Sequence, residues 1–210
     1  GLSIPVGKDS LSMQVQWTGT GDRGPGTGGG EADAGTAAPQ FHKSVSPVSL
    51  IVTAFAPVPD VSRQLTPLLE DGIDSELWLI GLGAGKQRLG GSILAQCFDA
   101  FGGACPDLDD PQRLRAFFEL IRDAREAGLL LAYHDRSDGG VFASLCEMAF
   151  CSRVGLDIDL DTWGDDRTEN VFRTLFNEEL GAVVQIAVDD RVEFADLVAR
   201  HGLVECAQRI

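Results

Sequence analysis

The residues best suited to chemistry in this 210-residue sequence stand in one run, HDRSDGG, at positions 134–140. Apolar residues precede the run, and a pattern typical of a helix follows it. Asp135 offers a hard oxygen ligand of the kind that Mg²⁺ prefers, and Ser137 offers a hydroxyl that can donate to a phosphate. Free N–H groups at the start of the helix favour an anion, and the two glycines allow close approach of the backbone. The run therefore predicts a phosphate and Mg²⁺ site.

The same spacing also fits a purely structural interpretation. Ser137 or Asp138 can be the N-cap of the following helix, and Asp135 can be a turn residue. His134 alone is more typical of a hydrogen-bonded structural histidine than of a catalytic one. The spacing by itself favours this second interpretation, and both remain open.

Two further segments resemble phosphate-binding loops but fail the template. In GKDSLSM at 7–13, Asp9 separates the lysine from the serine that should follow it directly. In GAGK at 83–86, the next residue is Gln87 instead of Ser or Thr. The common nucleotide-binding motifs are therefore absent from the sequence.

Two acidic segments are better explained without a ligand. Asp157, Asp159 and Asp161 alternate as in an EF-hand, but its sixth and twelfth positions are both threonine, where Gly and Glu are needed. They are expected on the exposed face of a strand at 155–160. FNEELG at 176–181 carries paired carboxylates after a helix, and a solvated helix end is favoured over a ligand contact.

The elements that must position these residues follow from apolar periodicity. From residue 76 onward strand and helix patterns alternate, with cap signals at Ser92 and at Asp110 followed by Pro111. This alternation predicts an α/β domain of layered, α+β architecture, with ligands beyond the carboxyl ends of its strands. Strands are expected at 76–82, 129–133, 155–160, 182–188 and from 203, and helices at 93–101, 111–128, 141–150, 168–176 and 190–201.

The first 75 residues are less regular. Residues 1–17 read as a loop leading into an alternating strand, and 48–58 as a buried strand stopped by prolines. Between them, 18–40 is rich in Gly, Ala and Thr, which predicts a mobile insertion because it buries too little apolar surface. Residues 60–75 are interpreted as a domain boundary.

Composition argues against two classes of partner. With 32 acidic and 17 basic residues the net charge is -15, and no basic stripe is present to bind nucleic acid. No apolar run approaches the ~18 residues of a membrane span. The five cysteines form no C-x-x-C pair, which predicts reduced thiols and a cytoplasmic location.

Because the chain starts on Gly1 and enters a motif at once, we expect a fragment of a longer protein.

Taken in order, five segments resemble those of the large single-chain phosphoribosylformylglycinamidine synthases. The resemblance covers nearly the whole chain except 18–40. It implies an ATP-hydrolysing C–N ligase of purine biosynthesis, which converts formylglycinamide ribonucleotide to the amidine with ammonia from glutamine. The segments are GKDSLSM (7–13), LGGSILAQ (89–96), AYHDRSDGG (132–140), LCEMAF (145–150) and FNEELGAVVQI (176–186).

The resemblance also implies a domain assignment. The synthetase region of this family looks like two copies of a unit resembling aminoimidazole ribonucleotide synthetase, each with an N-type and a C-type subdomain. Residues 1–70 match the tail of the second N-type subdomain, and 76–210 match the second C-type subdomain. The partners implied are small-molecule nucleotides and the remaining domains of the parent protein, including a glutaminase domain.

Functional residues transfer from the family only where the motifs match. Asp135 matches a Mg²⁺ ligand and Ser137 an ATP contact, while Lys8 and Asp9 match a motif that lines the nucleotide region. No catalytic residue is matched, so we expect ATP or ADP with Mg²⁺ as ligands and no turnover by this piece alone. Three alternatives stay open: another synthetase of the same superfamily, a non-catalytic half that holds a structural nucleotide, and a generic acidic binding module.

Overall fold

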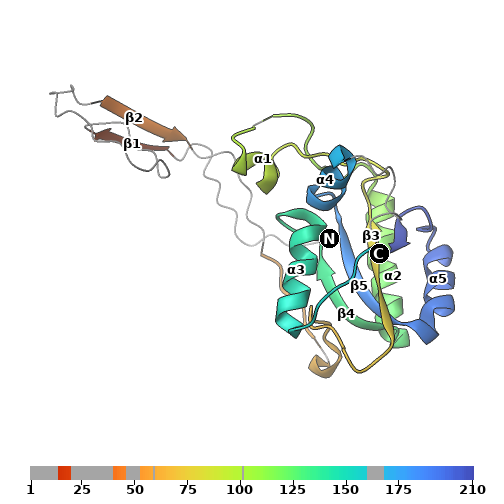
Figure 1. Ribbon diagram of the computed structural model, residues 1–210. Coiled ribbons are helices and arrows are strands. Elements are labelled where there is room, and N and C mark those ends of the chain that lie inside the picture. Colours follow the sequence, from red (N-terminus) through yellow and green to blue (C-terminus); the bar gives the residue numbers. More distant parts are fainter. Residues whose placement is uncertain (1–13, 20–39, 46–52, 59, 101, 160–167) are drawn as a thin grey trace. The chain divides into compact units, whose positions relative to one another are not determined.

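The part of the chain that the computed structural model describes comprises residues 14–19, 40–45, 53–58, 60–100, 102–159 and 168–210 (Figure 1). The chain divides into two compact units, Gly1–Val58 and Pro59–Ile210. The run at 134–140 belongs to the second unit.

The first unit contains a two-stranded antiparallel sheet. β1 (Gln14–Gly19) pairs with β2 (Gln40–Val45), with Gln14 opposite Val45 and Gly19 opposite Gln40. The alternating stretch predicted up to residue 17 is thus confirmed as a strand. Of the insertion predicted at 18–40, residues 20–39 lie outside the described part of the chain.

The buried strand predicted at 48–58 is wrong in the portion that the structure describes. Residues 53–58 belong to no helix or strand and are all exposed, Phe55 to 93%. Apolar composition misled because burial needs a partner surface, and Pro57 also lacks the N–H that a sheet ladder requires. The remaining residues, 48–52, lie outside the described part of the chain.

Strands and helices alternate in the second unit much as the sequence predicts. Short 3₁₀ turns stand at Val61–Arg63 and Val188–Asp190. The main elements in chain order are β3 (Ser75–Gly81), α1 (Ile93–Cys97), α2 (Pro111–Ala127), β4 (Leu130–Asp135), α3 (Gly140–Ser152), α4 (Thr168–Phe176), β5 (Gly181–Ala187), α5 (Arg191–Arg200) and β6 (Ala207–Arg209).

The four strands form one sheet in the order β4-β5-β3-β6, and every pairing among them is antiparallel. The layered α+β architecture is therefore confirmed. The expectation of a ligand crevice at aligned carboxyl ends of strands does not hold for this sheet, because neighbouring strands run in opposite directions. Antiparallel pairing instead places the end of β4 beside the start of β5, with Asp135 opposite Ala182.

The sheet is covered on both faces, with α2 and α5 on one side and α3 on the other (Figure 1). Ile80 and Val184 pack with the α2 and α5 side chains, whereas Leu79 and Val183 pack with α3. Neighbouring strand residues thus enter opposite cores, as the two-residue period of a strand requires. Consistent with its position between β4 and β3, β5 is buried along its five central residues.

Helix boundaries follow the cap signals of the sequence. Asp110 accepts a hydrogen bond from Gln112 N at the start of α2, and Gly128 ends that helix in the left-handed conformation with φ 77°. Ser92 caps α1 as predicted, but α1 ends at Cys97 instead of reaching residue 101. The strand predicted at 155–160 is not formed over 155–159, although the predicted alternation persists, with Leu156 and Ile158 partly buried.

Residues 65–70 belong to the second unit and precede its first strand, β3. Thr66 O accepts a hydrogen bond from Tyr133 N at 2.9 Å, on the edge strand β4. Leu69 N donates to Ser152 Oγ at 2.6 Å, and Glu70 N donates to the buried Gln185 Oε1 at 2.9 Å. This segment is therefore bonded to β4 at Thr66, and to α3 and β5 through Leu69 and Glu70.

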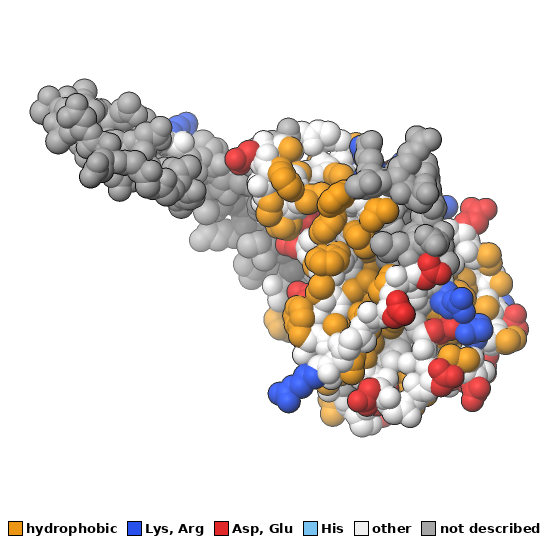
Figure 2. All heavy atoms as spheres, in the orientation of Figure 1, with side chains coloured by type: hydrophobic (Ala, Val, Ile, Leu, Met, Phe, Trp, Pro, Cys, Tyr) orange, Lys and Arg blue, Asp and Glu red, His pale blue; other side chains and the backbone are white. Residues whose placement is uncertain are grey.

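Hydrophobic side chains gather over α3 and α4 (Figure 2). Phe142, Phe150 and Phe172 are 47%, 66% and 51% exposed, and both Phe142 and Phe172 pack against the ring of Phe176.

No helix among the described residues has the length and apolar character needed to cross a membrane. The cysteines are free, and Cys206 alone is buried.

Replacing a core leucine should test the packing between α2 and the sheet. Leu120 is fully buried, so Leu120→Ala should lower the free energy of unfolding by about 2–5 kcal/mol. Leu114→Ala is the control on the same helix, where the side chain is 36% exposed and less than half that loss is expected. Urea denaturation of the 210-residue chain measures both. Equal losses would contradict the assigned core.

Candidate functional site

Arg136 joins the run at 134–140 to the loop that follows α4. Its Nε donates to Glu179 O at 2.5 Å, its Nη1 to Asn177 Oδ1 at 3.1 Å, and its Nη2 to Leu180 O at 3.0 Å. The backbone continues the contact, because Arg136 N donates to Gly181 O at 2.8 Å. Five donors in a planar fork suit this set of converging oxygens.

The guanidinium of Arg136 sits in a largely desolvated position. Burial lowers its pKa to about 10, and the charge of Glu179 opposes that shift. The side chain is therefore still a cation at neutral pH. A buried cation is tolerated only when its donors are satisfied, so the oxygens of the 177–180 loop are required where they lie.

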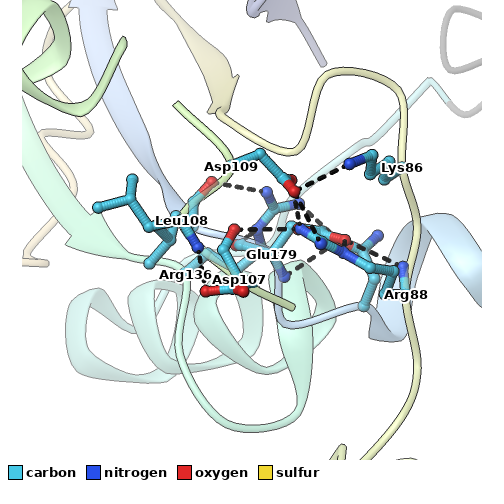
Figure 3. A network of polar contacts seen from close by, with 9 residues as sticks. Lys86, Arg88, Asp107, Leu108, Asp109, Arg136 and Glu179 are labelled. Atoms are coloured by element: carbon cyan, nitrogen blue, oxygen red, sulfur yellow. Dashed lines mark hydrogen bonds and ion pairs between the residues drawn. The ribbon is translucent and has the colours of Figure 1, made fainter. Parts of the chain in front are cut away.

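Glu179 continues the network toward the chain between β3 and α2 (Figure 3). Arg88 donates to both its carboxylate oxygens, Nε to Oε1 and Nη2 to Oε2, each at 2.6 Å. Arg88 also reaches Asp109, which binds Lys86 Nζ at 2.9 Å. Paired charges raise the pKa of Arg88 and lower that of Asp109, in each case chiefly through the side-chain hydrogen bond.

The interpretation of the FNEELG carboxylates as a solvated helix end is wrong for Glu179. This side chain is only 1% exposed. A Cβ on Gly83 would lie 2.9 Å from its Cγ and Cδ, so the glycine leaves the space that the carboxylate occupies. The correction has a physical cause: Arg88 pairs with the charge in two places and makes its burial possible.

Glu178 lies on the other side of the same loop. Its Oε1 accepts hydrogen bonds from Gly139 N at 2.8 Å and from Ile93 N at 2.9 Å. These amides open α3 and α1, so the second carboxylate of the pair also contacts the protein. Three of the predicted motif segments, 89–96, 132–140 and 176–186, therefore meet at one junction.

The start of α3 differs from both interpretations of the sequence. Its N-cap is Gly139, with φ 85° and no side-chain cap, so neither Ser137 nor Asp138 serves as the cap. Gly140 has φ 71°, and a Cβ there would lie 2.5 Å from Leu175 O. The sequence predicted that the glycines allow a ligand to come close; at Gly140 the group that lies close in the structure is the end of α4.

Asp135 and Ser137 both have exposed side chains on this loop. Tyr133 Oη donates to Asp135 Oδ1 at 2.5 Å; burial, and then this hydrogen bond, raises the pKa of Tyr133. The backbone of Asp135 is bonded to α3, since its carbonyl oxygen accepts a hydrogen bond from the Ser144 hydroxyl at 3.1 Å. Lys8 and Asp9 lie outside the described residues.

His134 has the hydrogen-bonded structural environment that the sequence favours. Its Nδ1 lies 2.6 Å from Asp135 O, and its Nε2 lies 2.7 Å from Glu147 Oε2. Both ring nitrogens thus face acceptor oxygens of the protein. Through Glu147, the imidazole connects the start of this loop to α3.

The metal-binding capacity of the described residues is limited. Among them, no group of three or more His, Cys, Asp or Glu side chains is arranged to hold an ion. Asp157 and Asp159 are exposed, and Asp161 lies outside the described residues. Mg²⁺ often takes only one or two protein carboxylates and draws other ligands from phosphates and water. The exposed carboxylate of Asp135 fits one such position.

Sequence reasoning missed the residues that build the junction: Arg88, Arg136, Glu178 and Glu179. One signal was available, because charged residues follow the apolar strand pattern at 129–133 and two glutamates stand a few residues ahead of the pattern at 182–188. Their pairing depends on the antiparallel sheet, which the spacing did not reveal.

A family model and several solved structures are similar to this chain. The family model described as AIR synthase related protein, C-terminal domain, matches residues 75–210. Among solved structures, T. maritima PurL complexed with ATP is 16% identical, with a TM-score of 0.53, over 71% of this chain and 23% of that chain. Phosphoribosylformylglycinamidine synthase II from Thermotoga maritima is 14% identical, with the same TM-score and coverage. At these identities the likeness shows the fold, and the chain spans about a quarter of their length.

Removing the buried carboxylate should test the junction. Glu179→Ala leaves Arg88 without its main partner, and we expect the free energy of unfolding to fall by about 3–5 kcal/mol. The control is Glu119→Ala, which breaks an exposed pair with Arg115 and should cost less than about 1 kcal/mol. Chemical denaturation provides the comparison. Similar losses for both variants would show that the Glu179 pair is no stronger than a surface pair.

A methyl group at position 140 should separate α3 from the end of α4. Gly140→Ala should lower the free energy of unfolding by about 1–3 kcal/mol from its φ alone, with the contact to Leu175 O adding to the loss. Gly155→Ala is the matched control, because a Cβ there meets nothing within 4 Å. Thermal unfolding of both variants would decide, and a neutral Gly140→Ala would exclude the close approach.

Proposed function

This chain belongs to the family of AIR synthase related proteins, and from that premise we propose that it forms part of the synthetase region of a phosphoribosylformylglycinamidine synthase. The parent enzyme would be a cytoplasmic, glutamine-dependent C–N ligase that hydrolyses ATP to make formylglycinamidine ribonucleotide. The five ordered motif segments support this assignment. It is also supported by the similar fold of T. maritima PurL, whose solved structures include complexes with ATP and with FGAR.

The domain assignment is part of the proposal. Residues 1–70 would be the tail of an N-type subdomain, and 76–210 a C-type subdomain of the second synthetase unit. The remaining domains, including the glutaminase domain, would lie elsewhere in the parent protein. The family match over residues 75–210 supports the C-type subdomain, and coverage of only 23% of a solved structure supports a longer parent protein.

The observation that carries the nucleotide site is the alternation along 135–137. Asp135 and Ser137 are exposed, whereas Arg136 between them turns inward to the 177–180 loop. The anchored Arg136 restrains the backbone between two exposed side chains of suitable chemistry, which supports a preorganised ligand-binding loop. The arrangement offers a carboxylate and a hydroxyl at a fixed backbone.

In the proposed site each residue has a separate task. Asp135 would provide one carboxylate ligand to Mg²⁺, which when bound neutralises phosphate charge. Ser137 would donate its hydroxyl to a phosphate oxygen of ATP or ADP. Lys8 and Asp9 would line the nucleotide region. Arg136, Ser144 and His134 do not reach the ligand; they hold the backbone of the loop.

Turnover by this chain alone is not expected. Phosphoryl transfer depends on several elements that act together, and no residue here is assigned to catalysis. A second candidate function is a structural nucleotide held without turnover. One observation favours it. Both ring nitrogens of His134 already contact protein oxygens, so this imidazole is not free to transfer a proton to or from a bound nucleotide.

Calorimetric titration of Mg-ADP into the 210-residue chain tests the site. Asp135→Asn should weaken binding about tenfold, since it replaces a charged metal ligand by a neutral one. Asp157→Asn, at an exposed aspartate outside the loop, should leave affinity unchanged. With Mg²⁺ removed by EDTA, the difference between wild type and Asp135→Asn should disappear.

Two results would contradict the proposal. Equal Mg-ADP affinity of wild type and Asp135→Asn would exclude Asp135 as a ligand. Formation of the amidine from ammonia, ATP and formylglycinamide ribonucleotide by the isolated chain would contradict the expected inactivity. Bound nucleotide that co-purifies and resists exchange would favour the structural role.

A further inference from the structure

Glu178 connects the starts of two helices that are 46 residues apart at their first contacts, Ile93 and Gly139. A single carboxylate oxygen accepts both backbone N–H groups, at 2.9 and 2.8 Å. Charge-assisted hydrogen bonds of this kind are about twice as strong as neutral ones. A negative charge is also favoured where helix N–H groups are unpaired.

The amides that open α3 are already bonded within the protein. Gly139 N donates to Glu178, and Gly140 N donates to Ser137 O at 2.9 Å. The sequence had suggested that these groups would face a phosphate. A ligand that took the Gly139 amide would have to displace Glu178, so this carboxylate acts on the backbone of the loop and not on a ligand.

The two glutamates of the loop therefore anchor different neighbours. Glu179 binds Arg88 on one side, and Glu178 binds the start of α3 on the other. Ser137 lies two residues from the amide that Glu178 holds, and Asp135 lies two residues before Ser137. Glu178 is thus linked, through the Gly139 amide, to the backbone that carries these two exposed side chains.

We propose that Glu178 is a positioning residue for nucleotide binding, which couples the 89–93 turn to the loop that carries Asp135 and Ser137. The proposal rests on the proposed nucleotide site. Glu178→Gln keeps an oxygen acceptor and removes the charge, whereas Glu178→Ala removes both. Glu205→Gln, at an exposed glutamate far along the chain, serves as the control.

Amide resonances of the ¹⁵N-labelled 210-residue chain test the bridge without any ligand. Glu178→Ala should move the Gly139 and Ile93 amide-proton signals upfield together, and Glu178→Gln should move them partway. Glu205→Gln should leave both in place. If neither signal moves, or only one of them, the bridge is overturned.

Mg-ADP affinity then tests the positioning role. Glu178→Ala should weaken binding about tenfold, and Glu178→Gln should restore it to within about threefold of wild type. A purely structural residue would lower the unfolding midpoint while the folded protein kept its affinity, and that result would overturn the proposal. If wild type binds no Mg-ADP, the proposed nucleotide site fails and the positioning role fails with it, whatever the amide signals show.

Discussion

Oxygen atoms of the 177–180 loop surround the guanidinium of Arg136, and the rest of the candidate site depends on that contact. A cation in this desolvated position must have its donors satisfied, so the loop cannot move away without leaving a buried charge unpaired. With Arg136 directed inward, its neighbours Asp135 and Ser137 are directed outward. Glu179, whose carbonyl oxygen accepts from Arg136, carries the restraint onward through its carboxylate to Arg88. Through Arg136 and then Glu179, the loop at 135–138 is connected to the 177–180 loop and to Arg88.

The antiparallel sheet brings these loops together. β4 ends beside the start of β5, so residues 135 and 182 are opposite one another although 47 positions separate them in sequence. Gly181 stands at this corner because a Cβ there would lie 2.2 Å from Ile80 O on β3. A side chain at that position would force β5 away from β3. The geometry of the site therefore depends on β5, an inner strand of the sheet that is buried along its five central residues.

Local signals in the sequence were sufficient for most of the helices and strands. Asp110, Pro111 and Gly128 mark the ends of α2 correctly, because capping depends on a few neighbouring residues. Strand direction was not predictable in this way, since antiparallel and parallel neighbours can share the same apolar pattern. Residues 53–58 show the same limit, because an apolar run cannot reveal whether a partner surface exists. In the site, exposed Asp135 and Ser137 were recognised from their types, whereas Arg136 and Glu179 act through pairing that only the fold creates.

The segment at 65–70 has a consequence for how such a domain can be separated from its parent. It occupies the edge of β4 through the hydrogen bond from Tyr133 N to Thr66 O, whereas the family match begins only at residue 75. A protein trimmed to the family boundary would carry a bare strand edge, the kind of surface that recruits other chains into aggregates. Keeping residues 65–70 would retain the hydrogen bond that Thr66 O accepts at this strand, and with it a partner for part of the edge.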